Sequence, residues 1–413
     1  MPCSKLYKIE SEIGSLNIKT FDLVNAEGVV VYRTNGDFMP PICPRGHYRS
    51  ARYEELEYDL VTKMSYRDSA RILNRIRNQE TGATPTTMRN QTESEGQSIY
   101  EAMDKIAEIT FEENGFTQSG TKKPETTIEL TEDVKNTQEA CVVSDLSKEL
   151  EVEISTEEFE AGESINISID EVCCKHQASK RPCENREKEP KQVRNTVIHV
   201  QQGDKTYAIV GKTMDMAMRL LVGFMLTNGL IGSYPITFFA DGAKNIKNAV
   251  EHYFGFMPYR YVLDWHHLVK KSGELLSSAI KSKDKRNEVL TKLTSILWLG
   301  KTIEAIKYLD SLGDDYVKSE KHITNLIEYL GRNEHTIQCY AARQRLDLRI
   351  SSNRVEKSND LIVSERQKHN GMSWSKDGSF GLASVRTCQL NSQLGSWVNH
   401  KIIRFTFDRH NAA

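Results

Sequence analysis

Residues 236–242 have the sequence ITFFADG, an apolar run that ends in Asp241 and Gly242. Aromatic and β-branched residues favour strands, and a glycine after the carboxylate permits a sharp turn. We therefore expect a buried strand over 236–240, followed by a helix over 243–254. A second apolar run, INISID, ends in Asp170. The sequence thus predicts two carboxylates, each at the end of a strand.

The segments around these two runs predict an α/β fold with a mixed sheet. Two further strands are expected over 193–201 and 205–210, joined by a Gly-Asp turn at 203–204 that is typical of a β-hairpin. A helix is expected over 212–228 and a strand over 259–263. Early consecutive strands followed by alternating helix and strand indicate a sheet with both antiparallel and parallel pairs.

A third acid, Glu356, lies in a polar stretch with helical character at 351–367. Apolar residues recur at helical spacing over most of 265–348, which separates Asp241 from Glu356. The sequence therefore predicts an all-helical insertion in the sheet domain, followed by a helix that carries Glu356.

The N-terminal part is expected to contain an irregular arm, 1–50, and a helical region, 51–115. Within that region Ser65 fits a helix N-cap, and a Thr-Pro pair at 84–85 starts another helix. These elements predict a helix-turn-helix that binds DNA, although an ordinary helical hairpin has the same pattern. Residues 116–164 form an acidic linker with an uncertain strand. The chain is thereby divided into 1–50, 51–115, 116–164, 165–264, 265–348 and 349–413.

Composition indicates a globular protein outside the membrane. The 413 residues are 38% hydrophobic and 27% charged, and no apolar run approaches the roughly 18 residues of a membrane span. The first 20 residues lack the features of a signal peptide, so we expect a cytoplasmic location. The net charge of −2 does not favour nucleic-acid binding, but residues 351–413 carry nine Lys or Arg and five Asp or Glu. A chain whose net charge is close to zero can still have a basic surface that binds nucleic acid.

Asp170, Asp241 and Glu356 together predict a site for two divalent cations. A lone Asp at a strand end usually caps a turn, and a lone Glu on a helix is usually solvated. Two strand-end carboxylates and one on a facing helix, however, supply the oxygen ligands that Mg²⁺ or Mn²⁺ prefers. Such a metal pair clamps the attacking and leaving oxygens of a phosphodiester. The pattern predicts phosphoryl transfer on nucleic acid.

A second polar group is formed by Asp264 and His267, which flank the start of the helical block. His267 is expected to face back toward Asp264 across one helical turn. The pair either anchors the strand-to-helix junction or takes part in catalysis, and the sequence leaves both roles open. A zinc site that includes His266 and His267 is not favoured.

Zinc is also not favoured at the cluster Cys173, Cys174, His176 and Cys183. Adjacent side chains on a strand point to opposite faces, so neighbouring cysteines are poor chelators. The eight cysteines of the chain include no CxxC pair and suggest no disulfide framework.

Several motifs resemble those of Mutator-like and related DDE transposases, and of the ISLre family of insertion-sequence transposases. They are DGAKNI at 241–246, DWHHL at 264–268, NRVEKSN at 353–359, GMSWS at 371–375, and IDEV at 169–172 with Lys175 and Gln177. The resemblance runs from about residue 50 to 400 and keeps the motif order.

This resemblance implies a ribonuclease-H-like fold with a helical insertion, and it places the catalytic, metal-binding triad on Asp170, Asp241 and Glu356. It implies a DNA transposase that cleaves transposon ends and transfers strands into target DNA with two Mg²⁺ ions, Mn²⁺ substituting. The partners implied are terminal inverted repeats and target DNA, bound by a homodimer or larger assembly. A bacterial enzyme of this kind acts at the nucleoid.

Four residues are candidates for DNA contact: Lys244, Arg354, Lys357 and Trp374. The first three lie near the predicted carboxylates. Trp374 would stack on an unpaired base, or pack against the final helix. Two alternatives to an active transposase stay open, a catalytically inactive domesticated transposase that binds DNA and a structure-selective nuclease without strand transfer.

Overall fold

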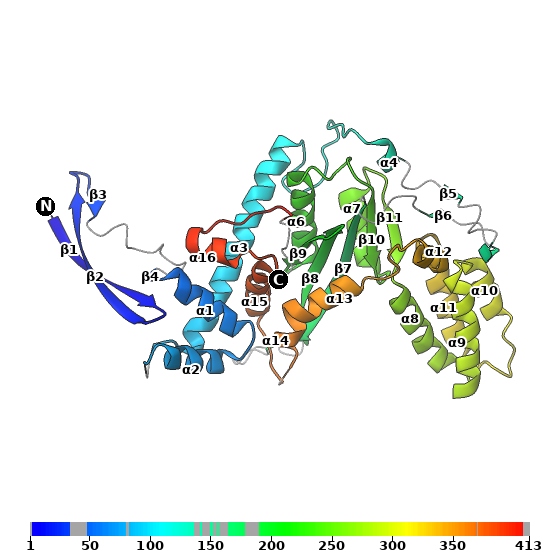
Figure 1. Cartoon of the computed structure of the whole chain (residues 1–413). Coiled ribbons are helices and arrows are strands. Elements are labelled where there is room, and N and C mark those ends of the chain that lie inside the picture. The colour runs from blue at the N-terminus through cyan, green and yellow to red at the C-terminus, as the bar shows by residue number, and fades with distance from the viewer. Residues whose placement is uncertain are drawn as a thin grey trace, which may run out of the picture.

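The computed structural model describes residues 2–33, 48–79, 82–135, 141–142, 149–151, 155–156, 164–177, 190–369 and 371–407. The chain has a mixed α/β architecture (Figure 1). None of the helices in the described ranges combines the length and apolar character that a membrane crossing requires.

A five-stranded mixed sheet forms the centre of the molecule, with strand order β11-β10-β7-β8-β9. β7, β8 and β9 pair antiparallel, whereas β10 pairs parallel to both β7 and β11. The strands are β7 (Ile165–Lys175), β8 (Gln192–Gln202), β9 (Lys205–Gly211), β10 (Ile236–Ala240) and β11 (Arg260–Leu263). The mixed sheet expected from the sequence is confirmed, as is the hairpin with Gly203 and Asp204 at its turn.

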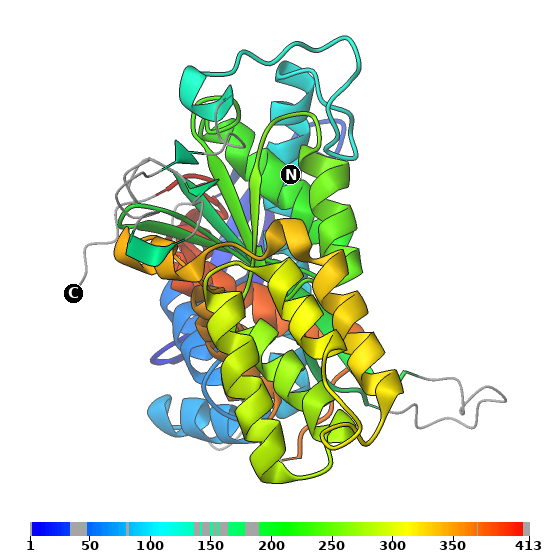
Figure 2. The ribbon, with the colours of Figure 1, turned by 90° about the vertical axis from the view of Figure 1, so that its right-hand side faces the viewer.

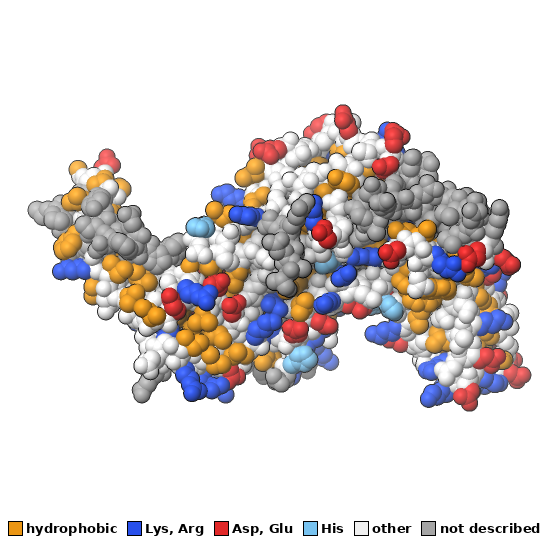
Figure 3. All heavy atoms as spheres, viewed as in Figure 1, with side chains coloured by type: hydrophobic (Ala, Val, Ile, Leu, Met, Phe, Trp, Pro, Cys, Tyr) orange, Lys and Arg blue, Asp and Glu red, His pale blue; other side chains and the backbone are white. Residues whose placement is uncertain are grey.

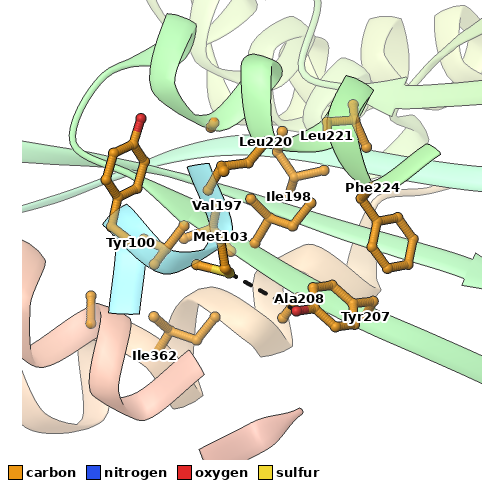
Figure 4. Close-up of a cluster of buried hydrophobic side chains, with 14 of the residues drawn as sticks. Tyr100, Met103, Val197, Ile198, Tyr207, Ala208, Leu220, Leu221, Phe224 and Ile362 are labelled. Atoms are coloured by element: carbon orange, nitrogen blue, oxygen red, sulfur yellow. Dashed lines mark hydrogen bonds between the residues drawn. The ribbon is translucent and has the colours of Figure 1, made fainter. Parts of the chain in front are cut away.

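Helices cover this sheet on both faces. α6 (Met214–Thr227) packs on β8 and β9, while α15 (Lys376–Leu390) also contacts both of these strands. The long α3 (Pro85–Glu113) packs against both α6 and α15. Figure 4 shows Met103 of α3 beside Leu220 and Phe224 of α6 and Tyr207 of β9, all buried. This apolar contact joins the N-terminal helices to the sheet.

The all-helical insertion is confirmed and has its own core. Its helices lie side by side at the front of Figure 2 and pack against the β10–β11 edge through Phe239 and Val262. Trp265, Trp298 and Tyr340 form an aromatic cluster at its base. The helices are α8 (Trp265–Ala279), α9 (Lys283–Trp298), α10 (Thr302–Asp310), α11 (Glu320–Arg332), the short η4 (Glu334–Thr336) and α12 (Tyr340–Arg345).

The helix predicted over 351–367 is present but is not regular. It begins as α13 (Asn353–Asn359), continues as the π-helical η5 (Asp360–Ser364), and ends as α14 (Glu365–Gln367). π-helical segments are rare and often occur at functional sites. α13 packs on β7 and β8, so Glu356 is carried on a helix that crosses the sheet. The final helix, α16 (Leu394–His400), packs on α1.

The expectation of an irregular arm over 1–50 is wrong for its described residues. They form a four-stranded sheet of order β3-β2-β1-β4, which lies at one end of the molecule in Figure 1. Its apolar side chains are largely exposed, as at Leu6 and Leu23, so no buried face produced an alternating pattern. The strands are β1 (Pro2–Ser11), β2 (Gly14–Val24), β3 (Val30–Arg33) and β4 (Tyr48–Arg49).

The helices predicted over 51–115 are confirmed. α1 (Ala51–Val61) and α2 (Tyr66–Ile76) are separated by Ser65, whose side chain accepts from the N–H of Asp68 as an N-cap. Thr84 caps α3 in the same way. The acidic stretch 116–164 contains α4 (Glu132–Lys135) and the short β5 (Cys141–Val142) and β6 (Ser155–Thr156). Most of its glutamate-rich part lies outside the described residues.

Candidate active site

Asp170 lies inside β7, so the expectation that it ends the strand is wrong. The parallel pairing of β10 with β7 stops at Phe239 and Ser168, whereas the antiparallel pairing with β8 continues, with Asp170 opposite Val197. Asp170 therefore stands just beyond the end of β10 although its own strand continues. Asp170 lies at an open edge because β10 ends there, whereas β7 itself continues.

Asp241 directly follows β10, as predicted. Its Oδ1 accepts from the N–H of Ala243 at 2.9 Å, which closes the turn into α7 (Lys244–Phe254). Gly242 has a φ of +77°, and a β-carbon there would approach Leu263 Cδ1 to 2.6 Å. Glycine adopts this left-handed conformation without steric cost. The Asp-Gly pair therefore positions Asp241 at the same edge of the sheet as Asp170.

The electrostatic surroundings of Asp170 include the charge of Asp241. Burial raises the pKa of the Asp170 carboxyl to about 6. The N–H of Glu171, which donates to Asp170 Oδ1 at 2.8 Å, opposes this rise, and the negative charge of Asp241 adds to it. Like charges raise a carboxyl pKa in this way when they lie close together. The edge of the sheet thus concentrates negative charge.

α13 joins this edge through Asn359, whose Nδ2 donates to Asp170 Oδ2 at 2.6 Å. Glu356 lies three positions earlier, and residues at that spacing share one face of a helix. Its Oε1 is 3.1 Å from Nε2 of His267 at the start of α8. His267 also lowers the pKa of Asp170 through its charge. The structure therefore brings Asp170, Asp241, Glu356 and His267 into one neighbourhood.

Asp264 is buried at the end of β11 and stabilises two segments. Its Oδ1 accepts from the N–H of His267 at 2.8 Å and so caps α8. Its Oδ2 accepts from Ser352 Oγ at 2.7 Å and from the backbone N–H of Ser352, just before α13. The prediction that the side chain of His267 faces Asp264 is wrong, because its ring is directed to Glu356. Asp264 therefore anchors the junction between β11 and α8. Through Ser352 it also holds the start of α13, the helix that carries Glu356.

The donors at this edge fit a hard divalent cation in their chemistry. The three carboxylates offer oxygen ligands only, and a cation beside Asp170 and Asp241 would offset their mutual repulsion. Among the described residues, however, no three His, Cys, Asp or Glu are grouped closely enough to hold a metal ion. The Glu356 carboxylate is instead engaged by His267. The metal pair stays a prediction.

The candidate DNA contacts fall into two groups. Lys244, Arg354 and Lys357 are exposed, and Figure 3 shows Lys and Arg side chains gathered over α13. Trp374, in contrast, is only 6% exposed, and its Nε1 donates to the carbonyl of Gln367 at 3.0 Å. A buried ring cannot stack on a base, so the hypothesis of base stacking by Trp374 is wrong for this conformation. The structure contains packing instead, but against Tyr66, Arg366 and Gln367 and not against the final helix that was expected.

The sequence did not indicate Asn359 and Ser352 as site residues. Both lie within or beside the NRVEKSN motif at 353–359, so proximity to Glu356 was the available signal. A third missed contact joins Asn245 Nδ2 to Glu171 Oε2 at 2.8 Å, which ties α7 to β7. These amides position the strands and helices that carry the acids.

The adjacent cysteines lie on opposite sides of β7, as the alternation of side chains along a strand requires. Cys174 is buried and lies 3.4 Å from Ser379 Oγ, whereas Cys173 is partly exposed on the other side of β7. His176 follows at the end of the strand, in a bridge with Trp374. Cys183 lies outside the described residues.

No family model matches the chain, and no curated protein matches it. A comparison with solved structures finds similarity to a chain of the Drosophila P element transposase strand transfer complex. The two chains are 11% identical over 89% of each, with a TM-score of 0.26. A TM-score this low does not establish a common fold.

Proposed function

We propose that this protein is a DNA transposase of the DDE type, related to the ISLre insertion-sequence family and to Mutator-like transposases. The observation that carries the proposal is the meeting of Asp170, Asp241 and the Glu356 helix at one edge of a mixed sheet. The hydrogen bond from Asn359 to Asp170 joins α13 to β7 and so holds the Glu356 helix beside Asp170.

The fold supports the proposal. Three antiparallel strands followed by two parallel ones, in the order β11-β10-β7-β8-β9, fit the ribonuclease-H-like sheet that the motif resemblance implies. The helical block between β11 and α13 fits the implied insertion. The motifs around Asp241, Asp264 and Glu356 lie at strand ends and at helix starts, where they face a common edge.

In the proposed reaction Asp170, Asp241 and Glu356 would hold two Mg²⁺ ions, with Mn²⁺ as a substitute. The bound ions would lower the pKa of the attacking oxygen and neutralise charge on the leaving oxygen. The chain itself orients the carboxylates: Asn359 holds Asp170, the Gly242 turn holds Asp241, and Asp264 fixes the start of the Glu356 helix. Exposed Lys244, Arg354 and Lys357 would bind DNA phosphates around this edge.

Two phosphoryl transfers complete the proposed activity. Water first attacks a phosphorus at the transposon end, so that a new P–O bond forms and the bond to the 3′-oxygen breaks, which leaves a 3′-hydroxyl. That hydroxyl then attacks a target phosphodiester, forms the joined strand and releases the target's own 3′-hydroxyl. Atoms and charge balance without any oxidant or reductant. Since two ends are joined to one target, we expect a homodimer or larger assembly on DNA.

The test is Mg²⁺-dependent cleavage and joining of labelled duplexes that carry the element's own end sequences. Wild type is compared with Asp241→Asn, and with Glu251→Gln on the exposed side of α7 as a matched control. We expect wild type and the control to cleave and join, and Asp241→Asn to do neither. Equal activity in Asp241→Asn would remove this aspartate from the site.

A second candidate function is favoured by one observation, the engagement of Glu356 by His267 in place of a ligand group. It is a catalytically inactive, domesticated transposase that binds DNA. End binding by wild type without cleavage in Mg²⁺ or Mn²⁺ would select this function. Cleavage without joining to target plasmid would instead select a nuclease.

A further inference from the structure

A cavity of about 330 Å³ lies beside the start of α13, on the loop that leads to Glu356. Arg349 and Arg354 both line it, and Asp347 is its one acidic lining residue. The charge of Arg354 lowers the pKa of Arg349, which shows that the two guanidinium groups are close. Two cations therefore face the same small volume.

Arg349 is held in place by its backbone rather than by a charge partner. Its carbonyl accepts from Arg343 Nε at 2.6 Å. Its Nη1 is buried and has no hydrogen-bond partner within the described part of the chain. Burial, and secondarily the charge of Arg354, lowers its pKa to about 10. A partly buried guanidinium whose buried Nη1 has no partner in the described part of the chain is costly, so an anion that enters the cavity would offset that cost.

The neighbouring His199 provides no counter-charge. Burial, together with the charges of Arg349 and Arg354, lowers the pKa of His199 to about 4, so the imidazole is neutral near pH 7. Its Nδ1 lies 3.2 Å from Ser358 Oγ on α13. Its Nε2 is buried and, among the described residues, unpaired. The polar surface behind α13 therefore offers donors and positive charge, and no carboxylate of the residues that the structure describes pairs with either arginine.

We propose that Arg349 and Arg354 form a binding site for a backbone phosphate of DNA, on the side of α13 that faces His199. This inference rests on the proposed function, which already counts Arg354 among the DNA contacts, and adds to it Arg349 and the cavity in which the phosphate would be held. Guanidinium groups bind phosphate through paired N–H···O bonds, and such contacts fix the register of a protein on DNA. Because the site immediately precedes Glu356, a phosphate held there would set the position of the catalytic helix relative to the strand being cut.

The first test is the salt dependence of binding to an end duplex, measured by fluorescence anisotropy between 50 and 300 mM KCl, concentrations chosen around the range in which phosphate contacts are lost. Each phosphate contact contributes roughly 0.9 to the slope of log K against log salt. We expect Arg349→Gln and Arg354→Gln each to reduce the slope by about 1. Arg286→Gln, an arginine on α9 that bonds to Ser277, is the matched control and should leave it unchanged.

The second test identifies the phosphate. Single methylphosphonate substitutions, which remove one backbone charge at a time, are scanned along the end duplex. One position should weaken binding by wild type and have no further effect on Arg349→Gln. Arg354 is exposed, so its variant keeps the test valid if Arg349→Gln does not fold. Arg349→Lys should recover part of the slope.

The outcomes separate this inference from the proposed function. If wild type cleaves DNA and both glutamine variants keep the salt-dependence slope of wild type, the phosphate site is overturned. The proposed transposase activity is not affected by that result. Binding of inorganic phosphate to wild type in calorimetry, lost in Arg354→Gln without any change in slope, would assign the cavity to a free anion and also overturn the inference. Absence of any DNA binding by wild type would overturn both.

Discussion

Asn359 Nδ2 donates to Asp170 Oδ2 at 2.6 Å, so the helix that carries Glu356 is joined directly to the strand that carries Asp170. The remaining Oδ1 of Asp170 accepts from the N–H of Glu171. With one donor on each oxygen, the orientation of this carboxylate is fixed from two elements. The relative placement of two proposed metal ligands thus depends on one amide.

Asn359→Ala should reduce cleavage by about 10- to 100-fold, because residues that orient a metal ligand typically contribute that much to affinity or activity. The apparent Mg²⁺ concentration for half-maximal activity should rise. Asn399→Ala is the control, since Asn399 is at an exposed position of α16 and its Nδ2 bonds to the Gly395 carbonyl. Mg²⁺ titrations of the cleavage rate measure both quantities, and identical curves for the two variants would contradict the positioning role.

Asp264→Ala should destabilise the protein by about 2–3 kcal/mol, because it leaves buried donors of Ser352 unpaired and removes the cap of α8. Ser352→Ala, which loses only the hydroxyl, should cost about 1 kcal/mol. Urea denaturation followed by circular dichroism measures both. If Asp264 were catalytic and not structural, Asp264→Ala would lose activity while its urea midpoint stayed at that of wild type.

Gly96→Ala should destabilise the contact between α3 and α15, since a methyl group there would overlap the backbone of Gly381. We expect a cost of about 1–3 kcal/mol, as for other overpacked sites. Gly331→Ala in α11 is the matched control, because nothing lies within 4 Å of its added carbon. That control should gain about 0.5–1 kcal/mol from helix propensity. Thermal melting measures both effects. A melting temperature that shifts in the same direction for both variants would contradict the close contact between Gly96 and Gly381.

The free energy of unfolding should fall as pH rises from about 4.5 to 7, because the pKa of Glu57 is raised in the folded protein. This buried acid lies against Arg49, near Glu54 and Glu95, and burial raises its pKa to about 7 despite Arg49. The folded protein therefore binds a proton that the unfolded chain has lost in this window, so unfolding is favoured as pH rises. Glu57→Gln should show a flatter curve of stability against pH than wild type, whereas Glu101→Gln on the exposed face of α3 should not. Parallel curves for wild type and Glu57→Gln would refute the shift.

The central strands of the sheet domain could be predicted because complete burial produces a continuous apolar run. The five residues 236–240 are all buried, and the run before Asp170 is buried as well, so apolar runs marked both strands. The N-terminal sheet could not be predicted for the opposite reason. Leu6 is 69% exposed, and side chains without a buried face show no alternation that a sequence reader can detect.

The sequence indicated the acids that lie near one another in the candidate site but not the contacts that they make. Asp241 follows its strand directly, so local sequence placed it. The position of Asp170 depends on where β10 stops, and the partner of His267 depends on the path of α13 across the sheet. Both are long-range pairings, which a local pattern does not contain. Trp374 illustrates the same limit, since its burial comes from Gln367 and the neighbouring Tyr66 and Arg366.

The most direct test of the central claim is Mn²⁺ binding to the protein on an end duplex, followed by electron paramagnetic resonance. Wild type and Glu251→Gln should bind two ions per active site. Asp170→Asn, Asp241→Asn and Glu356→Gln should each lose at least one ion while binding the duplex as wild type does. Equal Mn²⁺ binding by wild type and all three variants would contradict a metal site built from these carboxylates.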